Sequence, residues 1–207
     1  AFGQSGPHRD YPAADIVAPN QDSDLLTAAA DRVTLENLTL TGGLTGLSQD
    51  HQPTFLARNV VVQDSSGVGV RVRVGDARLI GCTVQRSGGT GIEVTRGGSV
   101  MLSGGSQVLD SAGAGIRATR HGLVSLSSST VMRSGAQGIV LSSGSQGSIT
   151  NVSTIAENAG NGIDVLMSQA DVTGNNIIRN NLGFGVGGHN SPITIDENTI
   201  TGNQGDG

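Results

Sequence analysis

The chain of 207 residues has no tryptophan, very few other aromatic residues and a single cysteine. Because aromatic residues make up only 2% of the sequence, large rings cannot fill its interior, and the core must be built from small aliphatic side chains. The lone Cys82 excludes both a disulfide framework and a thiolate metal cluster. We expect this cysteine to occupy a packed interior position rather than to act as a reactive thiol.

Lysine is also absent, since all 12 basic residues are arginine, and this excludes lysine-based catalysis. The net charge of −5 is unevenly distributed. Residues 71–133 contain 8 arginines and 3 acidic residues, whereas residues 1–70 contain 3 and 8 and residues 134–207 contain 1 and 6. A basic belt between two acidic ends can attract a polyanion, although solvated surface charge without a partner explains it equally simply. Nucleic acid is a poor match for an acidic chain without lysine.

Long apolar runs are missing too. None approaches the roughly 20 residues that cross a bilayer, so we expect no membrane insertion. The sequence shows no signal peptide, and a start at "AFGQSG" is compatible with one having been removed. A secreted, periplasmic or cell-surface location is therefore our expectation.

A repeat dominates the rest of the chain. The segment "GTGIEVTRGG" (89–98) has close relatives on both sides, and each contains a glycine directly before an apolar residue. We name these the anchor glycines: Gly46, Gly69, Gly91, Gly115, Gly138, Gly162 and Gly185. Successive anchor glycines are 22 to 24 residues apart, and a period this constant indicates a solenoid.

A second column, entirely aliphatic, keeps the same phase: Leu40, Val62, Val84, Val108, Val131, Ile155, Ile178 and Ile200. Around it, segments such as "VTLENLTL" (33–40) alternate between apolar and polar residues, as a strand with one buried face does. We therefore predict rungs of about three short strands, separated by Gly, Asn and Ser turns and stacked in parallel at about 4.8 Å.

Two rows of these rungs have predicted structural roles. The row two positions before the aliphatic column changes from apolar through hydroxyl to amide side chains, and inward Ser and Asn at a bend would bond to turns and to each other. We call it the bend row: Leu38, Val60, Cys82, Ser106, Ser129, Ser153, Asn176 and Asn198. The anchor glycines would serve a corner that needs either positive φ or close contact between rungs.

The two ends give less regular patterns. Residues 1–30 are predicted to form a lead-in segment with an N-terminal cap or first strand. Within "DSDLLTAAADR" (22–32), composition permits a short capping helix, but phase favours a strand because Leu25 lies 22 residues before Leu47. At the other end, Gly207 would be the first residue of a further rung. We expect a protein partner or a continuation of the coil to cover that open rung.

Segments such as "GTGIEVTRGG", "GAGIRATRHG" (113–122) and "GNGIDVLMSQ" (160–169) resemble the parallel β-helix repeats of the pectate-lyase-like superfamily. The resemblance covers residues 31–207. It implies an all-β, right-handed, single-stranded parallel β-helix of about 7–8 rungs, each of 22–24 residues. It implies less about function, because the superfamily includes polyuronate lyases, pectinases, alginate epimerases, phage tailspikes, adhesins and metal-centre maturation proteins.

Basic side chains gather on one predicted outer face. Directly after the anchor apolar residues, Arg71, Glu93 and Arg117 should stack on three successive rungs about 5 Å apart. The predicted ligand-binding residues on this face are Arg71, Arg73, Arg96, Arg117 and Arg120. The same pattern is also explained as a charge ladder on a solvated surface, where each exposed pair contributes about 0 to 1 kcal/mol.

The resemblance implies an enzymatic role for that face. In superfamily members that act on acidic polysaccharides, a basic group removes the proton beside a carboxylate whose charge is neutralised by Arg or Ca²⁺. By that resemblance, Arg117 or His121 would be the base, Arg71 would clamp the carboxylate, and Glu93 would lie between them. The chain departs from the enzyme patterns, since it has no "DPH" triplet and no Asp cluster for Ca²⁺.

Two functional hypotheses therefore stay open. The first is a non-catalytic extracellular or cell-surface scaffold or interaction module, with no cofactor and no catalytic residues. The alternative is a lyase or epimerase of acidic polysaccharides using Arg71, Glu93, Arg117 and His121, and Ca²⁺ is a candidate cofactor in this alternative alone. No resident metal site is predicted, because no shared spacing relates the four histidines, His8, His51, His121 and His189.

Overall fold

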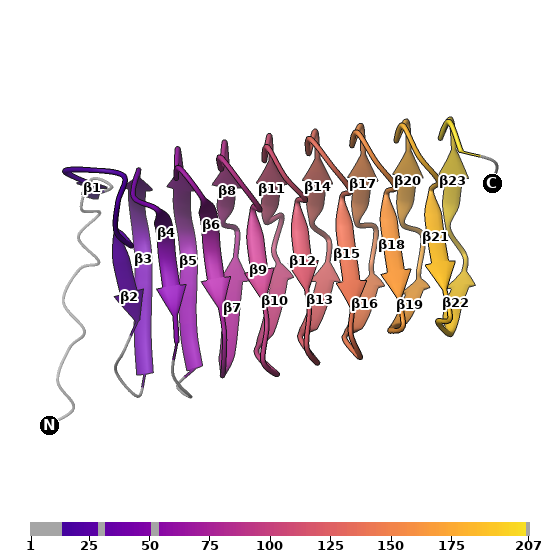
Figure 1. Cartoon of the computed structure of the whole chain (residues 1–207), viewed down its shortest axis with the longest axis horizontal. Helices are drawn as coiled ribbons and strands as arrows, with labels where there is room; N and C mark the ends of the chain where they lie inside the picture. The colour runs from indigo at the N-terminus through magenta and orange to yellow at the C-terminus, as the bar shows by residue number, and fades with distance from the viewer. Residues whose placement is uncertain (1–13, 29–31, 51–53, 206–207) are drawn as a thin grey trace, which may run out of the picture.

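The computed structural model describes residues 14–28, 32–50 and 54–205. They form a right-handed solenoid of parallel strands with about eight turns, arranged as a row of rungs from the indigo end to the yellow end in Figure 1. This confirms the predicted all-β parallel coil. The described segments contain no helix, and hence none long and apolar enough to cross a membrane.

One sheet receives the first strand of each rung, and we call it the first sheet. Its eight strands pair in chain order. They are β2 (Leu26–Ala28), β4 (Thr45–Gln49), β6 (Val68–Val72), β9 (Ile92–Val94), β12 (Ile116–Ala118), β15 (Ile139–Ser142), β18 (Ile163–Leu166) and β21 (Val186–His189).

A larger, bent sheet forms the rest of the wall and has two limbs. Because they come after the first sheet in each rung, we call them the second limb and the third limb. β3 (Arg32–Thr41) and β5 (Thr54–Gln63) run through both limbs, and β1 (Ala14–Val17) pairs with β3. The second limb continues with β7 (Asp76–Ile80), β10 (Ser99–Ser103), β13 (Leu123–Ser127), β16 (Gln146–Thr150), β19 (Gln169–Thr173) and β22 (Ile193–Asp196). The third limb continues with β8 (Thr83–Gln85), β11 (Gln107–Leu109), β14 (Thr130–Met132), β17 (Thr154–Ala156), β20 (Ile177–Arg179) and β23 (Thr199–Thr201).

The core is narrow and aliphatic, as the composition requires. In the first sheet Ile92 lies opposite Val70 and Ile116, and all three side chains are buried. The aliphatic column is buried from Leu40 to Ile178, whereas Ile200 is 39% exposed. Burying such rows on every rung supplies the main favourable free energy of folding.

The bend between the second and third limbs explains the bend row. Each bend-row residue follows a residue with positive φ, for example Asn59 (52°), Gly105 (78°) and Asn175 (61°). The side chain then accepts a hydrogen bond from the backbone of the preceding rung: the Ser153 N–H donates to Asn176 Oδ1 at 2.9 Å. These polar side chains are bonded to turns and to one another, so the structural interpretation is confirmed.

The anchor glycines serve close contact rather than positive φ. None of them has a left-handed backbone conformation. A Cβ added at Gly115 would lie 2.5 Å from Val131 Cγ1 and 2.7 Å from the carbonyl oxygen of Gly138. Since real Cβ atoms do not approach other atoms so closely, only glycine allows the corner to pack against the aliphatic column.

At the N-terminal end, the strand interpretation is correct and the helix is wrong over Leu26–Ala28, which form β2. The register differs by one residue from the prediction, because Leu26 and not Leu25 pairs with Leu47. The remainder of the predicted lead-in, residues 1–13 and 29–30, and the predicted terminal Gly207 lie outside the described residues.

Candidate functional site

The predicted outward row exists in the first sheet, with Arg71 opposite Glu93 and Glu93 opposite Arg117. The Arg71 Nε donates to Glu93 Oε2 at 3.0 Å, and Arg71 Nη1 lies 3.9 Å from Asp24 Oδ1. The Arg71 side chain is only 19% exposed. This arginine therefore lies between two carboxylates of the chain itself, and these contacts occupy much of its guanidinium group.

Two members of the same row are less exposed than their outward position suggests. Ser48 lies opposite Arg71 and is 0% exposed, and Val140 lies opposite Arg117 and is 4% exposed. Val140 is also paired with Asp164 on its other side. Short side chains between longer neighbours on adjacent rungs are covered even on an outer face.

A second outward row lies two residues further along each rung. In it Arg73 Nη1 lies 3.4 Å from Asp50 Oδ1, so this arginine is also paired. On the next two rungs the row continues with hydroxyl groups, and Thr119 Oγ1 donates to Thr95 Oγ1 at 3.2 Å. Both threonines are half-buried.

Beyond these threonines lie basic residues that no described carboxylate pairs with. Within the described segments, Arg96, Arg117 and Arg120 form neither an ion pair nor a side-chain hydrogen bond. Arg96 (φ 56°) and Arg120 (φ 52°) are exposed turn residues on successive rungs, one directly after Thr95 and the other directly after Thr119. We call Arg96, Arg117 and Arg120, together with Thr95 and Thr119, the arginine face.

His121, the other candidate base, lies beside this face. It has a positive φ of 65° and is exposed. Its imidazole packs against Gly144 on the next rung, since a Cβ at Gly144 would lie 2.7 Å from His121 Nδ1. Arg117 and His121 make no side-chain hydrogen bond with any described residue, so no orienting group holds either of them as a general base.

The arginine face is suited to binding oxyanions. A guanidinium donates two parallel hydrogen bonds to a carboxylate, and the adjacent hydroxyls can bond to sugar hydroxyls. The structure places Arg96 and Arg120 on successive rungs, with Arg117 three residues before Arg120, whereas it pairs the predicted ligands Arg71 and Arg73 with carboxylates.

No group of three or more His, Cys, Asp or Glu residues with metal-binding geometry occurs among the residues the structure describes. His8 and His51 lie outside them. Cys82 is buried, and burial raises the pKa of its thiol. Its Sγ donates to the Ala57 carbonyl oxygen at 3.4 Å, which fits a packing role in the bend row.

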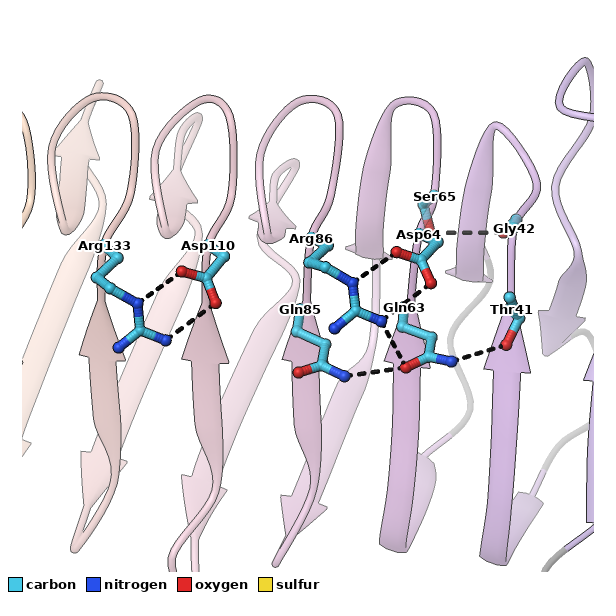
Figure 2. Close-up of polar contacts among 9 residues, drawn as sticks. All are labelled: Thr41, Gly42, Gln63, Asp64, Ser65, Gln85, Arg86, Asp110 and Arg133. Carbon is cyan, nitrogen blue, oxygen red and sulfur yellow. Dashed lines mark hydrogen bonds and ion pairs between the residues drawn. The ribbon is translucent and has the colours of Figure 1, made fainter.

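The sequence analysis missed a row of charges at the turn from the third limb to the first sheet. It alternates in sign from rung to rung, and every member has positive φ: Asp64, Arg86, Asp110, Arg133 and Glu157. Figure 2 shows Arg86 and Arg133 each reaching the aspartate of the preceding rung through two nitrogens, with distances of 2.6 to 3.0 Å. Gln63 also accepts from Arg86 Nη2 at 2.9 Å. We call this the turn row.

Hydrogen bonds from arginine dominate the electrostatics of the turn row. The bond from Arg86 lowers the pKa of Asp64, and the bond from Arg133 lowers the pKa of Asp110. The same bonds raise the pKa of both arginines. Each partner thus holds the other in its charged form, and these arginines are not available to a ligand.

A second missed row directly follows the turn row inside the coil. Asn158, Asn181 and Asn203 stack so that Asn158 Nδ2 donates to Asn181 Oδ1, and Asn181 Nδ2 donates to Asn203 Oδ1, both at 2.8 Å. The same Asn181 oxygen accepts from the Asn158 backbone N–H at 3.1 Å. The equivalent spacing in the sequence, 23 and 22 residues, was the signal that could have revealed this row.

Comparison with known proteins agrees with this geometry. A family model described as "Right handed beta helix region" matches residues 23–173 and 66–207. No curated protein and no solved structure matches the chain significantly. The matched ranges cover most of the chain and coincide with the stacked rungs, so the chain belongs to the right-handed β-helix region family.

Proposed function

We propose that this chain is a non-catalytic extracellular or cell-surface binding module, whose arginine face holds an acidic polysaccharide. The observation that supports the proposal is that Arg96, Arg117 and Arg120 lack acidic partners among the described residues, whereas neighbouring Arg71 and Arg73 have them. A polymer lying along the solenoid would meet these guanidinium groups on two successive rungs. Carboxylates of uronate units are the groups they would bind.

The enzymatic alternative has less support from the same geometry. Its carboxylate clamp, Arg71, is bonded to Glu93 and lies near Asp24, so a substrate carboxylate would have to displace them. Its candidate bases have no orienting partner in the described part of the chain. A basic group must be held within hydrogen-bond reach of the proton that it removes.

A second contact of the module is proposed at the rung formed by β21, β22 and β23. Among the described residues these strands pair only with β18, β19 and β20. The rung exposes apolar side chains, with Ile195 47% and Ile200 39% exposed. A protein partner that pairs with this edge would bond its open backbone groups and cover the isoleucines. Ile195→Lys should abolish a self-association or partner association that light scattering detects.

The polysaccharide proposal is tested by binding of alginate, pectate and glycosaminoglycans, with neutral dextran as the control. We expect at least one acidic polymer to bind in calorimetry, and we expect added salt to weaken the complex because the charges are exposed. The double variant Arg117→Gln and Arg120→Gln should lose about tenfold in affinity or more. Arg179→Gln, which removes an exposed arginine on β20 that no described side chain pairs with, is the matched control and should bind like the original chain.

The same samples separate the two functions. An unsaturated uronate product, detected by its ultraviolet absorbance, would show a lyase and overturn the non-catalytic proposal. Incorporation of deuterium from the solvent at the uronate carbon beside the carboxylate would show an epimerase. That result would also overturn the non-catalytic proposal. If no acidic polymer binds, or if the double variant binds as well as the control, the arginine face has no such ligand.

A further inference from the structure

A second group of arginines lies on a different surface, at the N-terminal end of the second limb. A hollow of about 330 Å³ opens on the outer side of β3, β5 and β7. These three strands are neighbours in the sheet and lie in the left half of Figure 1. Arg32, Arg58 and Arg78 line it, one from each strand. We call this hollow the arginine pocket.

The strand register explains why the three guanidinium groups share one pocket. Arg32 lies opposite Thr54 on the next rung, and Thr34 lies opposite Leu56, which in turn lies opposite Arg78. Since side chains on a strand alternate between its two faces, all of these point outward. The arginines are therefore not stacked on each other but surround the polar and apolar groups at the centre of the pocket.

The pocket has more positive than negative charge. Arg58 Nη1 donates to Glu36 Oε1 at 2.8 Å. Within the described segments, Arg32 and Arg78 contact no carboxylate and make no side-chain hydrogen bond, and both are exposed. In the turn row of the same molecule, Arg86 and Arg133 each donate two hydrogen bonds to an aspartate. An excess of guanidinium groups in one hollow is thus a local feature of a chain whose net charge is −5.

The lining also contains the other groups that a small polar ligand requires. Thr34 and Thr54 present hydroxyl groups, which can donate and accept hydrogen bonds. Leu56 and Ile80 provide apolar surface in the same hollow. Pockets for small molecules combine apolar contact with a few polar groups that fix orientation, and their volumes begin at about 300 Å³.

We propose that the arginine pocket binds an acidic monosaccharide or a residue of similar size, held by its oxyanion group. The oxyanion, a carboxylate, sulfate or phosphate, would bond to Arg32 and Arg78. The threonine hydroxyls would bond to ligand hydroxyls, and Leu56 would contact the apolar face of the ring. This site goes beyond the polysaccharide proposal, because it lies on the second limb and shares no residue with the arginine face.

The test uses titration calorimetry and thermal unfolding of the whole chain with glucuronate, glucose 6-sulfate, glucose 6-phosphate and neutral glucose. At least one acidic sugar should bind and raise the melting temperature, and glucose should do neither. The acid that binds best identifies whether the oxyanion is a carboxylate, a sulfate or a phosphate. If none of them binds at millimolar concentration, the proposal is overturned.

Substitutions test whether the acidic sugar binds at the arginine pocket. Arg78→Gln should weaken it about tenfold, whereas the matched control Arg179→Gln should leave it unchanged. Glu36→Gln should strengthen it about threefold, because it frees Arg58 to bond the ligand, and an arginine cluster with a purely structural role would not respond in this way. Unchanged binding by Arg78→Gln and Arg32→Gln would overturn the proposal. Loss of sugar binding in Arg117→Gln alone would assign the ligand to the arginine face, so the two proposals fail separately.

Discussion

The turn row and the arginine face use the same residue type in opposite ways. In the turn row, aspartate and arginine alternate on successive rungs. Each of the two arginines donates hydrogen bonds to the aspartate of the preceding rung. On the arginine face, Arg96 and Arg120 follow each other on successive rungs, and no acidic residue bonds them in the described chain. Charges that alternate along the solenoid neutralise one another, whereas charges of one sign leave a field that acts on molecules outside.

The same contrast separates side chains that recur along the coil from groups that are confined to a few rungs. Anchor glycines and inward amides recur on rung after rung and make contacts within the wall, so they serve the fold. Arginines of the arginine face and the arginine pocket occur on two or three rungs only. Changes in the recurring rows should therefore reduce stability, and changes in the local groups should leave it intact.

The largest effect is expected where the rungs touch most closely. Gly115→Ala should lower the free energy of unfolding by about 3 kcal/mol, because its Cβ would overlap Val131 and the Gly138 carbonyl. The matched control is Gly97→Ala, which meets no atom within 4 Å but has a φ of 77°, and should cost only about 1 kcal/mol. Denaturant unfolding followed by circular dichroism measures both. A loss at Gly115→Ala no larger than that at Gly97→Ala would show that the corner accommodates a Cβ and that close contact does not select glycine there.

The inward amides should come next. Asn181→Leu is expected to cost about 2 kcal/mol, because the buried Asn158 N–H and Nδ2 would lose their acceptor. Gln169→Ala, which removes an exposed amide in β19, should be nearly neutral in the same unfolding measurement. A neutral Asn181→Leu would mean that the apolar side chain compensates fully for the lost hydrogen bonds.

A smaller, pH-dependent effect is expected in the turn row. The pKa of Asp110 is lowered by its bond to Arg133, so the pair contributes stability above the ordinary carboxyl pKa of 3.8 and loses it as the pH falls through the lower folded value. Both side chains are at least 40% exposed, so the contribution should stay below about 1 kcal/mol. Asp110→Asn should destabilise the chain at pH 7, and its difference from the original chain should shrink as the pH falls below 3.8. A constant difference at all pH values would exclude the ion pair as its cause.

The smallest effect on stability should occur on the arginine face. Arg117→Gln and Arg120→Gln should each change the free energy of unfolding by less than about 0.5 kcal/mol, since neither side chain has a partner to lose in the described chain. The same variants are those expected to lose polysaccharide binding. A clear loss of stability would instead assign these arginines to the fold.

The fold was predictable because several columns share one period. Once the anchor glycines were aligned, the pairing of Arg71 with Glu93 and of Glu93 with Arg117 followed, and the structure confirms that register. Spacing does not determine which neighbouring side chain an arginine contacts. Only the structure shows that Arg71 pairs with Glu93 and lies near Asp24.

Two of the groups that the sequence did not reveal, the turn row and the arginine pocket, escaped for different physical reasons. Members of the turn row share a positive φ and not a chemical type, and a backbone angle is not visible in composition. The pocket arginines Arg32, Arg58 and Arg78 are out of phase with one another, because they lie at different heights on their strands. When the repeats are aligned by their period, the three arginines fall in separate columns. Their shared position around one hollow is visible only in the structure.

The alternating signs of the turn row also bear on how a repetitive chain avoids folding incorrectly. Nearly identical rungs could stack out of sequence, for instance with one rung looped out. Skipping a rung would set Asp64 beside Asp110, or Arg86 beside Arg133, and like charges on adjacent strands repel. Correct order sets opposite charges together at the same positions. The turn row thus distinguishes consecutive rungs by charge, whereas the core, with similar Leu, Val and Ile side chains on each rung, distinguishes them much less sharply.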